Sequence, residues 1–224
     1  MQVLTDKDLK LGGFAGLTEK RFITDRRVFK QAKSKAFDGI GNFIYLADAN
    51  FQPFGETHMH GHREVDVITV MVDGNIKHQG SLGHGSDLSA GDVQVQRAGA
   101  EGFEHNEVNP DGHENRLLQL WVMPDELGER AGYKVYSPEQ GKVSKIFGGS
   151  KTQDEFFYSQ TEIAVAKLNE GQSHEHQGEV LAYVVKGSVE INGETFVSKT
   201  LIKEANKLSI LANTDADVIL IYVS

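Results

Sequence analysis

A β-rich unit occurs twice along the chain, and this repeat limits the folds that the sequence can adopt. "HGHREVDVITVMVDG" (60–74) resembles "HEHQGEVLAYVVKG" (174–187), since both begin with H-x-H and continue into a hydrophobic run that ends in a glycine turn. "AGDVQVQRAG" (90–99) aligns with "EANKLSILAN" (204–213) at nearly the same offset of about 114 residues. The sequence therefore predicts two copies of one β unit.

The hydrophobic runs have the length and composition of strands. They are short, rich in β-branched residues and bounded by turn signals, among which Asn192-Gly193 favours a two-residue hairpin. The expected strands are "VDVITVMVDG", "DVQVQRAG", "RLLQLWVM", "VLAYVVKG", "SVEINGETFV", "LSILAN" and "DVILIYVS". A short helix is expected near "PDELGERAG" (124–132), where a proline precedes acidic residues. We predict an all-β chain built from barrels or sandwiches.

The length of the chain is sufficient for two such barrels. It has 224 residues, of which 39% are hydrophobic, and this is enough for real cores. We place one domain at residues 1–135 and the other at residues 136–224. The boundary is expected near "PEQGKVSKIFGGSKTQ" (138–153), where glycine, lysine and polar residues replace the strand pattern.

Composition excludes several kinds of chemistry and several partners. The chain has no cysteine, so any metal must be bound by nitrogen and oxygen. A net charge of −9 argues against non-specific binding to nucleic acid or to anionic lipid. The apolar runs are much shorter than the roughly 20 residues that cross a bilayer. Because "MQVLTDKDLK" also lacks an apolar signal core, we expect a cytoplasmic protein.

Candidate metal ligands occur in two stretches of the first copy. In "THMHGHREVD" (57–66), His58, His60, His62, Glu64 and Asp66 share one parity, so a strand would project them to one face. In "AEGFEHNEVNP" (100–110), His105 and Glu107 again share a face. Imidazole and carboxylate groups buried together would be costly to desolvate unless a cation joined them. The residues alone leave open whether His58 and His60, or His60 and His62, form the first ligand pair.

The second copy cannot assemble the same site. At the constant offset His105 corresponds to Ile219, and no histidine follows His176. We therefore expect one metal per chain, in the first copy, and none at His174 and His176. His58 is expected either to support the ligands or to face water. The remaining histidines, His78, His84 and His113, are interpreted as surface or hydrogen-bonded core residues.

Four motifs in the first copy resemble, in order, those of the pirins, a family of two-domain cupins. They are "HGHREVDVITVMVDG", "SAGDVQVQRAG", "EHNE" and "LLQLWVMP", within residues 55–124. The resemblance implies a bicupin, with two jelly-roll β-barrels in one chain. Carried over by position, the metal ligands of the family fall on His60, His62, His105 and Glu107. Two departures from the family pattern affect the mouth of the pocket: one extra residue between Gly99 and His105, and Asp66 where many relatives have glutamate.

The resemblance also implies an activity. Pirin-like proteins with quercetin 2,3-dioxygenase activity suggest a metal-dependent dioxygenase that uses dioxygen and a flavonol or another enol, with Glu107 as ligand and base. Iron(II) is the expected ion, and manganese, nickel, cobalt, copper or zinc would suit the same donors. The alternative is a non-catalytic, metal-dependent co-regulator that binds a protein partner through the basic segment Lys20–Lys35. An isomerase or sugar-binding cupin is a third interpretation, because cupin folds support many chemistries.

Overall fold

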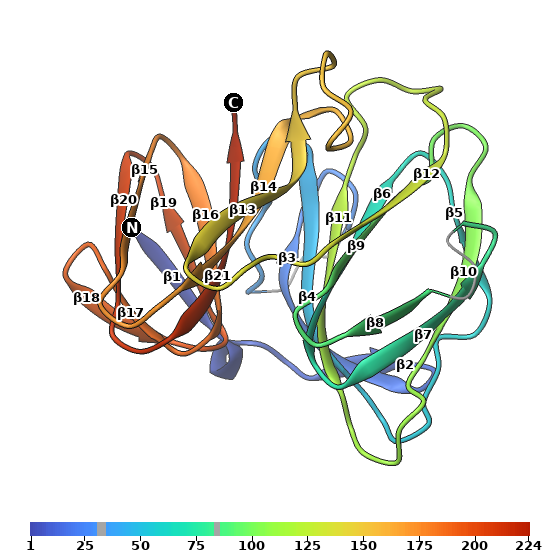
Figure 1. Cartoon of the computed structure of the whole chain (residues 1–224), viewed down its shortest axis with the longest axis horizontal. Helices are drawn as coiled ribbons and strands as arrows, with labels where there is room; N and C mark the ends of the chain where they lie inside the picture. Colours follow the sequence, from blue (N-terminus) through green and yellow to red (C-terminus); the bar gives the residue numbers. More distant parts are fainter. Residues whose placement is uncertain (31–34, 83–85) are drawn as a thin grey trace. The chain divides into compact units, whose positions relative to one another are not determined.

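Short strands make up nearly all of the regular structure. The computed structural model describes residues 1–30, 35–82 and 86–224, and in these residues strands are accompanied by one 3-10 helix, Asp6–Asp8. The described chain divides into two compact units: residues 9–137, and residues 1–8 together with 138–224 (Figure 1). Each unit contains two antiparallel sheets, the arrangement of a jelly roll. The prediction of an all-β bicupin is confirmed.

The unit of residues 9–137, here called the first barrel, contains a large and a small sheet among its described residues. In spatial order the large sheet contains β12 (Gly132–Tyr136), β9 (Val93–Arg97), β6 (Asp66–Asp73), β11 (Arg116–Val122), β4 (Phe43–Phe51), β3 (Leu17–Thr24) and β2 (Gly12–Phe14). The small sheet contains β5 (His60–His62), β10 (Phe103–Val108), β7 (Asn75–Gly80) and β8 (Asp87–Ser89).

The other unit, here called the second barrel, repeats this order. Its large sheet contains β1 (Gln2–Thr5), β19 (Thr200–Glu204), β16 (Val180–Lys186), β21 (Ala216–Val223), β14 (Ser159–Leu168) and β13 (Lys142–Gly149). Its small sheet contains β15 (Ser173–Gln177), β20 (Lys207–Ala212), β17 (Ser188–Ile191) and β18 (Glu194–Val197). All of the strands predicted from the sequence are present, and β13 lies within the predicted boundary segment, residues 138–153.

The N-terminal strand belongs to the second barrel. β1 pairs with β19, with Gln2 opposite Lys203 and Thr5 opposite Thr200, and Figure 1 shows it among the C-terminal strands. In the first barrel the corresponding place beside β9 is taken by β12. Residues 1–8 therefore differ from the expected division, which assigned them to the first domain. The reason is that an edge strand can be supplied by any part of the chain that reaches the open edge and satisfies its backbone groups.

The repeated glycines mark the same corner in both barrels. Gly74 follows β6 with φ of 76°, and Gly187 follows β16 with φ of 80°. This left-handed conformation favours glycine. A Cβ atom at these positions would collide with Asn115 or with Asp215. The predicted hairpin turn is also present, since Asn192 and Gly193 both have positive φ between β17 and β18.

The short helix predicted near residues 124–132 is absent, and this prediction is wrong. The segment forms turns, with Gly128 at φ of 88°. The Gly128 N–H donates to Glu64 Oε1 at 3.1 Å, and the Glu129 carbonyl accepts from the Ala100 N–H at 3.0 Å. These backbone groups form hydrogen bonds with neighbouring segments, and a local helix could form only if these hydrogen bonds were broken.

Candidate metal centre

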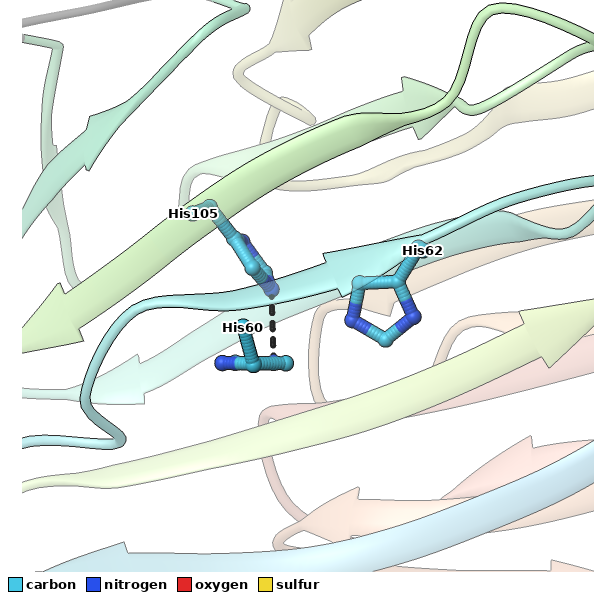
Figure 2. Close-up of side chains that lie close together, drawn as sticks. All are labelled: His60, His62 and His105. Atoms are coloured by element: carbon cyan, nitrogen blue, oxygen red, sulfur yellow. Dashed lines mark hydrogen bonds between the residues drawn. The ribbon is translucent and has the colours of Figure 1, made fainter.

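Three of the predicted ligands lie together inside the first barrel. His60 and His62 lie on β5, and His105 lies on the adjacent strand β10, directly opposite His60 in the register. The alternation of the short strand β5 turns His60 and His62 to the same face. Their candidate ligand nitrogens and that of His105 all lie within 4.8 Å of one another. Figure 2 shows the three side chains, with a hydrogen-bond contact between His105 and His60.

The other residues that were expected on the same strand face, His58, Glu64 and Asp66, are not part of this group. Residues His58 and Glu64 have φ of 61° and 50°, so the chain is not extended on either side of β5. The His58 side chain is 71% exposed and lies 3.4 Å from Glu56. Asp66 is buried and bonds to Arg97, with 2.8 Å between Oδ2 and Nη2. The expectation that all five side chains share one face is therefore wrong, because positive φ values interrupt the strand.

The backbone of His58 determines the tautomer of His60. The His60 Nδ1 atom lies 2.9 Å from the His58 carbonyl oxygen, and because a carbonyl can only accept, Nδ1 must carry the hydrogen. In the neutral ring Nε2 then keeps its lone pair. His60 is thus oriented to present Nε2 to a cation.

His62 and His105 also have the properties of metal ligands. Burial, followed by the effect of His60, lowers the pKa of His62 to about 4. Burial and the neighbouring histidines lower the pKa of His105 to about 2, so both rings are neutral at pH 7. The His105 Nε2 lies 3.0 Å from the His60 Nε2, and its buried Nδ1 has no partner in the described protein. Neutral, converging imidazoles are the donors that a divalent first-row metal requires, so the residues fit such an ion.

Glu107, the fourth predicted ligand, lies beside the histidines. It lines the same cavity, but it is not a member of the group whose ligand atoms lie within 4.8 Å of one another. Its Oε1 accepts hydrogen bonds from Thr69 Oγ1 at 2.9 Å and Gln94 Nε2 at 2.8 Å. Complete burial raises the pKa of Glu107 to about 7 although both hydrogen bonds oppose the shift. The carboxylate can therefore exchange a proton near neutral pH, and the four-ligand set stays a prediction.

The polar residues that hold Glu107 were not identified from the sequence. Thr69 and Gln94 are fully buried, and the Tyr133 hydroxyl donates to Gln94 Oε1 at 3.2 Å. Behind His105 lies the buried His78, whose Nε2 is 3.1 Å from Gln96 Nε2. One signal was available: "VQVQ" (93–96) places glutamines at alternate positions of a valine strand, where a purely structural barrel would have apolar residues.

The other histidines have ordinary surroundings in the described part of the chain. His113 is exposed, and His84 lies outside the described residues. In the second barrel His174 and His176 are half-buried on β15, and the His176 ring lies 4.5 Å from the Tyr222 ring. They are not among the described groups of three or more residues that could hold a metal.

The cavity in front of the histidines is small and mostly apolar. Its volume is about 50 Å³. Besides His60, His62, His105 and Glu107 it is lined by Phe14, Leu17, Glu19, Tyr45, Ala49, Phe51, Thr57, Leu117, Gln119 and Trp121. An apolar pocket with a few polar groups at one end is typical of a small-molecule site.

The basic segment offers less free charge than its sequence indicates. Arg21, Arg26 and Arg27 form ion pairs with Glu19, Asp38 and Asp25, respectively. Residues 31–34 of this segment lie outside the described residues. The described arginines are thus compensated, which weakens the case for a positively charged docking surface.

Comparison with known proteins identifies the family. The profile of the Pirin family matches residues 24–122. A Pseudomonas aeruginosa protein is 33% identical over 177 residues, which cover 74% of this chain and 76% of the relative. The protein of Escherichia coli K12 named quercetin 2,3-dioxygenase is 31% identical over 170 residues, with 72% of this chain and 73% of the relative covered. The chain belongs to the pirin family.

Solved structures agree with the fold. The crystal structure of the bacterial pirin YhhW from Escherichia coli in complex with nickel(II) matches with a TM-score of 0.84 at 22% identity, and it covers 99% of this chain and 98% of the other. This bacterial pirin therefore binds nickel(II) in its crystal structure. Within the described residues of the present chain, no helix is long and apolar enough to cross a membrane.

Proposed function

We propose that this chain is a metal-dependent dioxygenase that acts on a small enol-bearing molecule of the flavonol type. The observation that carries the proposal is the convergence of three histidines, His60, His62 and His105, on a cavity that is also lined by the buried carboxyl group of Glu107. Two Escherichia coli relatives that are named quercetin 2,3-dioxygenase, each 31% identical over 170 residues, support the proposal. A cytoplasmic location stays a prediction.

His60, His62 and His105 would hold the ion, and Glu107 would complete the set. Iron(II) is the ion that we expect, and nickel, manganese, cobalt, copper and zinc suit the same donors. When bound, the ion supplies a Lewis acid that polarises an enol oxygen and favours its reaction with dioxygen.

Glu107 would accept the hydroxyl proton of the substrate. Thr69 and Gln94 both bond to Oε1, so they fix the side chain and leave Oε2 as the oxygen that can face a ligand. A raised pKa makes the carboxylate a stronger base than an exposed one, and a base is most effective when its pKa is near the working pH. The apolar walls at Leu17, Phe51 and Leu117 would exclude water from the deprotonated substrate.

Oxygen uptake tests the proposal directly. Protein purified without a histidine tag is analysed for metals, depleted, reconstituted with each candidate ion and mixed with quercetin in an oxygen-electrode cell. We expect uptake that requires both metal and substrate. Metal-dependent capture of a protein partner without any turnover would instead favour the co-regulator interpretation and reject the dioxygenase.

A further inference from the structure

Two hydrogen-bond donors in the wall of the cavity have no acceptor in the described protein. They are Gln119 Nε2 and Trp121 Nε1, and both atoms are buried. The residues are two apart on β11, so they face the same side of the sheet, and both line the cavity that contains the histidines. A buried donor without an acceptor is unfavourable. An acceptor on a bound molecule is the partner that their position suggests.

We propose that the cavity selects a compact, uncharged hydroxy-carbonyl compound with oxygen acceptors that bond to Gln119 and Trp121. This inference rests on the proposed function, because the enol edge of the same molecule faces the histidines and Glu107. The ligand thus spans the cavity from the metal ligands to β11. Such a ligand is smaller than a three-ring flavonol.

The charges in the cavity favour an uncharged ligand. Glu19 is buried in the wall, where its Oε2 accepts from the Tyr45 hydroxyl at 2.7 Å and its Oε1 accepts from Arg21 Nε at 2.7 Å. Glu107 is the second carboxyl group of the lining, and the lining contains no lysine or arginine. At the end of the cavity away from the metal ligands, a ligand carboxylate would meet the acidic side chain of Glu19 and no lysine or arginine of the lining. Neutral carbonyl, ether or hydroxyl oxygens match the two N–H donors without this repulsion.

The size of the cavity favours a compact ligand. A volume of about 50 Å³ is well below the roughly 300 Å³ at which pockets for drug-sized molecules begin. The wall is formed by large side chains such as Phe51 and Trp121, and both belong to the central part of the large sheet. A single-ring compound requires much less displacement of these walls than a three-ring flavonol does.

The second barrel provides an internal comparison. Gln119 lies opposite Thr69 in the sheet, and the position related to it by the repeat is Leu220, which lies opposite Ala182. Trp121 corresponds in the same way to Tyr222. The unpartnered donors therefore occur in the barrel that has the three-histidine group, and not at the same places in the barrel that lacks it.

Binding measurements test the inference without requiring turnover. Trp121 is the single tryptophan of the chain, so its emission reports on this cavity. The protein as purified is titrated without oxygen with maltol, which is a single-ring hydroxypyranone, with comenate, its carboxylated analogue, and with quercetin. Calorimetry gives the dissociation constants independently. We expect maltol to bind more tightly than comenate or quercetin and to change the Trp121 emission.

Variants then test the two donors. Gln119→Leu removes the amide and imitates Leu220, and Gln119→Glu keeps the size but replaces the donor with an acceptor. Each is expected to weaken maltol binding by roughly 3- to 10-fold, the effect of one neutral hydrogen bond. Trp121→Phe should weaken maltol binding to a similar extent. Its dissociation constant is measured by calorimetry, because this variant has no tryptophan emission. Gln79→Glu is the matched control on the exposed face of β7, and it should leave the constant unchanged.

The outcomes separate the inference from the proposed function. Tight maltol binding that depends on Gln119, without oxygen uptake on any enol, would reject the dioxygenase and support the selectivity. Oxygen uptake with quercetin, together with maltol binding that is unaffected in both Gln119 variants, would overturn the inference and leave the dioxygenase intact. Tighter binding of comenate or quercetin than of maltol would also overturn it. Circular dichroism of each variant checks that the barrel is folded.

Discussion

The two barrels share a strand order but not an interior. Both small sheets begin with an H-x-H strand, β5 in the first barrel and β15 in the second. In the first barrel His60 lies opposite His105, whereas in the second His174 lies opposite Ile210. The first histidine of the H-x-H strand therefore lies opposite a third histidine in the first barrel and opposite an aliphatic side chain in the second barrel.

The difference extends across the whole interior. Glu107 is replaced by Ala212, since each lies two residues after the residue opposite the first histidine of the H-x-H strand. Thr69 and Gln94, which hold Glu107, are replaced by Ala182 and Ile202. The substituting residues belong to one buried apolar cluster of the second barrel, which contains Ala182, Val189, Ile202, Ile210, Ala212 and Leu220.

The two H-x-H strands therefore lie in different surroundings, and within the described residues only the first lies beside a third histidine and a buried carboxyl group. Two half-buried histidines at the rim of an apolar core can satisfy their nitrogens with water. A third buried imidazole and a buried carboxyl group require either a cation or a polar network, and the first barrel has such a network around Glu107. The polar side chains inside the first barrel thus depend on one another for hydrogen bonds. Substitutions that introduce the corresponding residues of the second barrel test this dependence.

The largest effect is expected when the first barrel is given the aliphatic residue of the second. His105→Ile reproduces Ile210 and removes one of three converging nitrogens. Metal affinity should fall by more than the roughly 100-fold that loss of a supporting partner can cause, so the purified protein should contain almost no metal. Elemental analysis measures this, and His174→Ala in the second barrel is the matched control. Equal metal loss in both variants would contradict the assignment of the site to one barrel.

A smaller change separates metal binding from chemistry. Glu107→Gln keeps the volume and can still bond to Thr69, but it removes the basic oxygen. We expect turnover to fall by about 100-fold or more, the usual contribution of a general base, while the three histidines retain part of the metal. Oxygen uptake and metal content are measured on the same sample. Full activity of this variant would show that Glu107 is not the base.

The strand segments and the grouping of three histidines could be predicted from the sequence. The alternation of "VDVITVMVDG" and the repeated glycine turns are local signals, and β6 and β16 form where they indicate. The grouping of His60, His62 and His105 followed from the pirin resemblance, and the structure brings these residues together. What could not be predicted depends on long-range pairing.

Three features of the structure could not be predicted from local sequence patterns. The position of β1 in the second barrel depends on which sheet edge is open, and no local pattern in residues 2–5 specifies it. The constant offset assigned Ile219 to the place of His105, but the structural counterpart is Ile210, because the connections between the strands of the second copy are shorter. The positive φ at His58 turns its side chain away from the row, and a parity argument assumes an extended chain throughout.

Removing the metal should loosen one barrel and not the other. A ligand at 100 times its dissociation constant stabilises the folded state by about 2.7 kcal/mol. Chelation should therefore increase amide hydrogen exchange in β5 and β10, whose register places the three histidines, and leave β15 and β20 unchanged. Peptide-resolved exchange before and after chelation measures this. Equal loosening of β15 and β20 would indicate a second metal at His174 and His176.

The smallest effect is expected at His58, and it decides the ligand register. His58 contacts His60 through its backbone carbonyl, which His58→Ala preserves, whereas its side chain is exposed beside Glu56. Metal content should therefore stay close to that of the unmodified protein, as measured by elemental analysis. His62→Ala, two residues beyond His60, should lose the metal under the same conditions. If instead His58→Ala loses the metal and His62→Ala keeps it, the ligand pair is His58 and His60, and β5 must shift its register to place them.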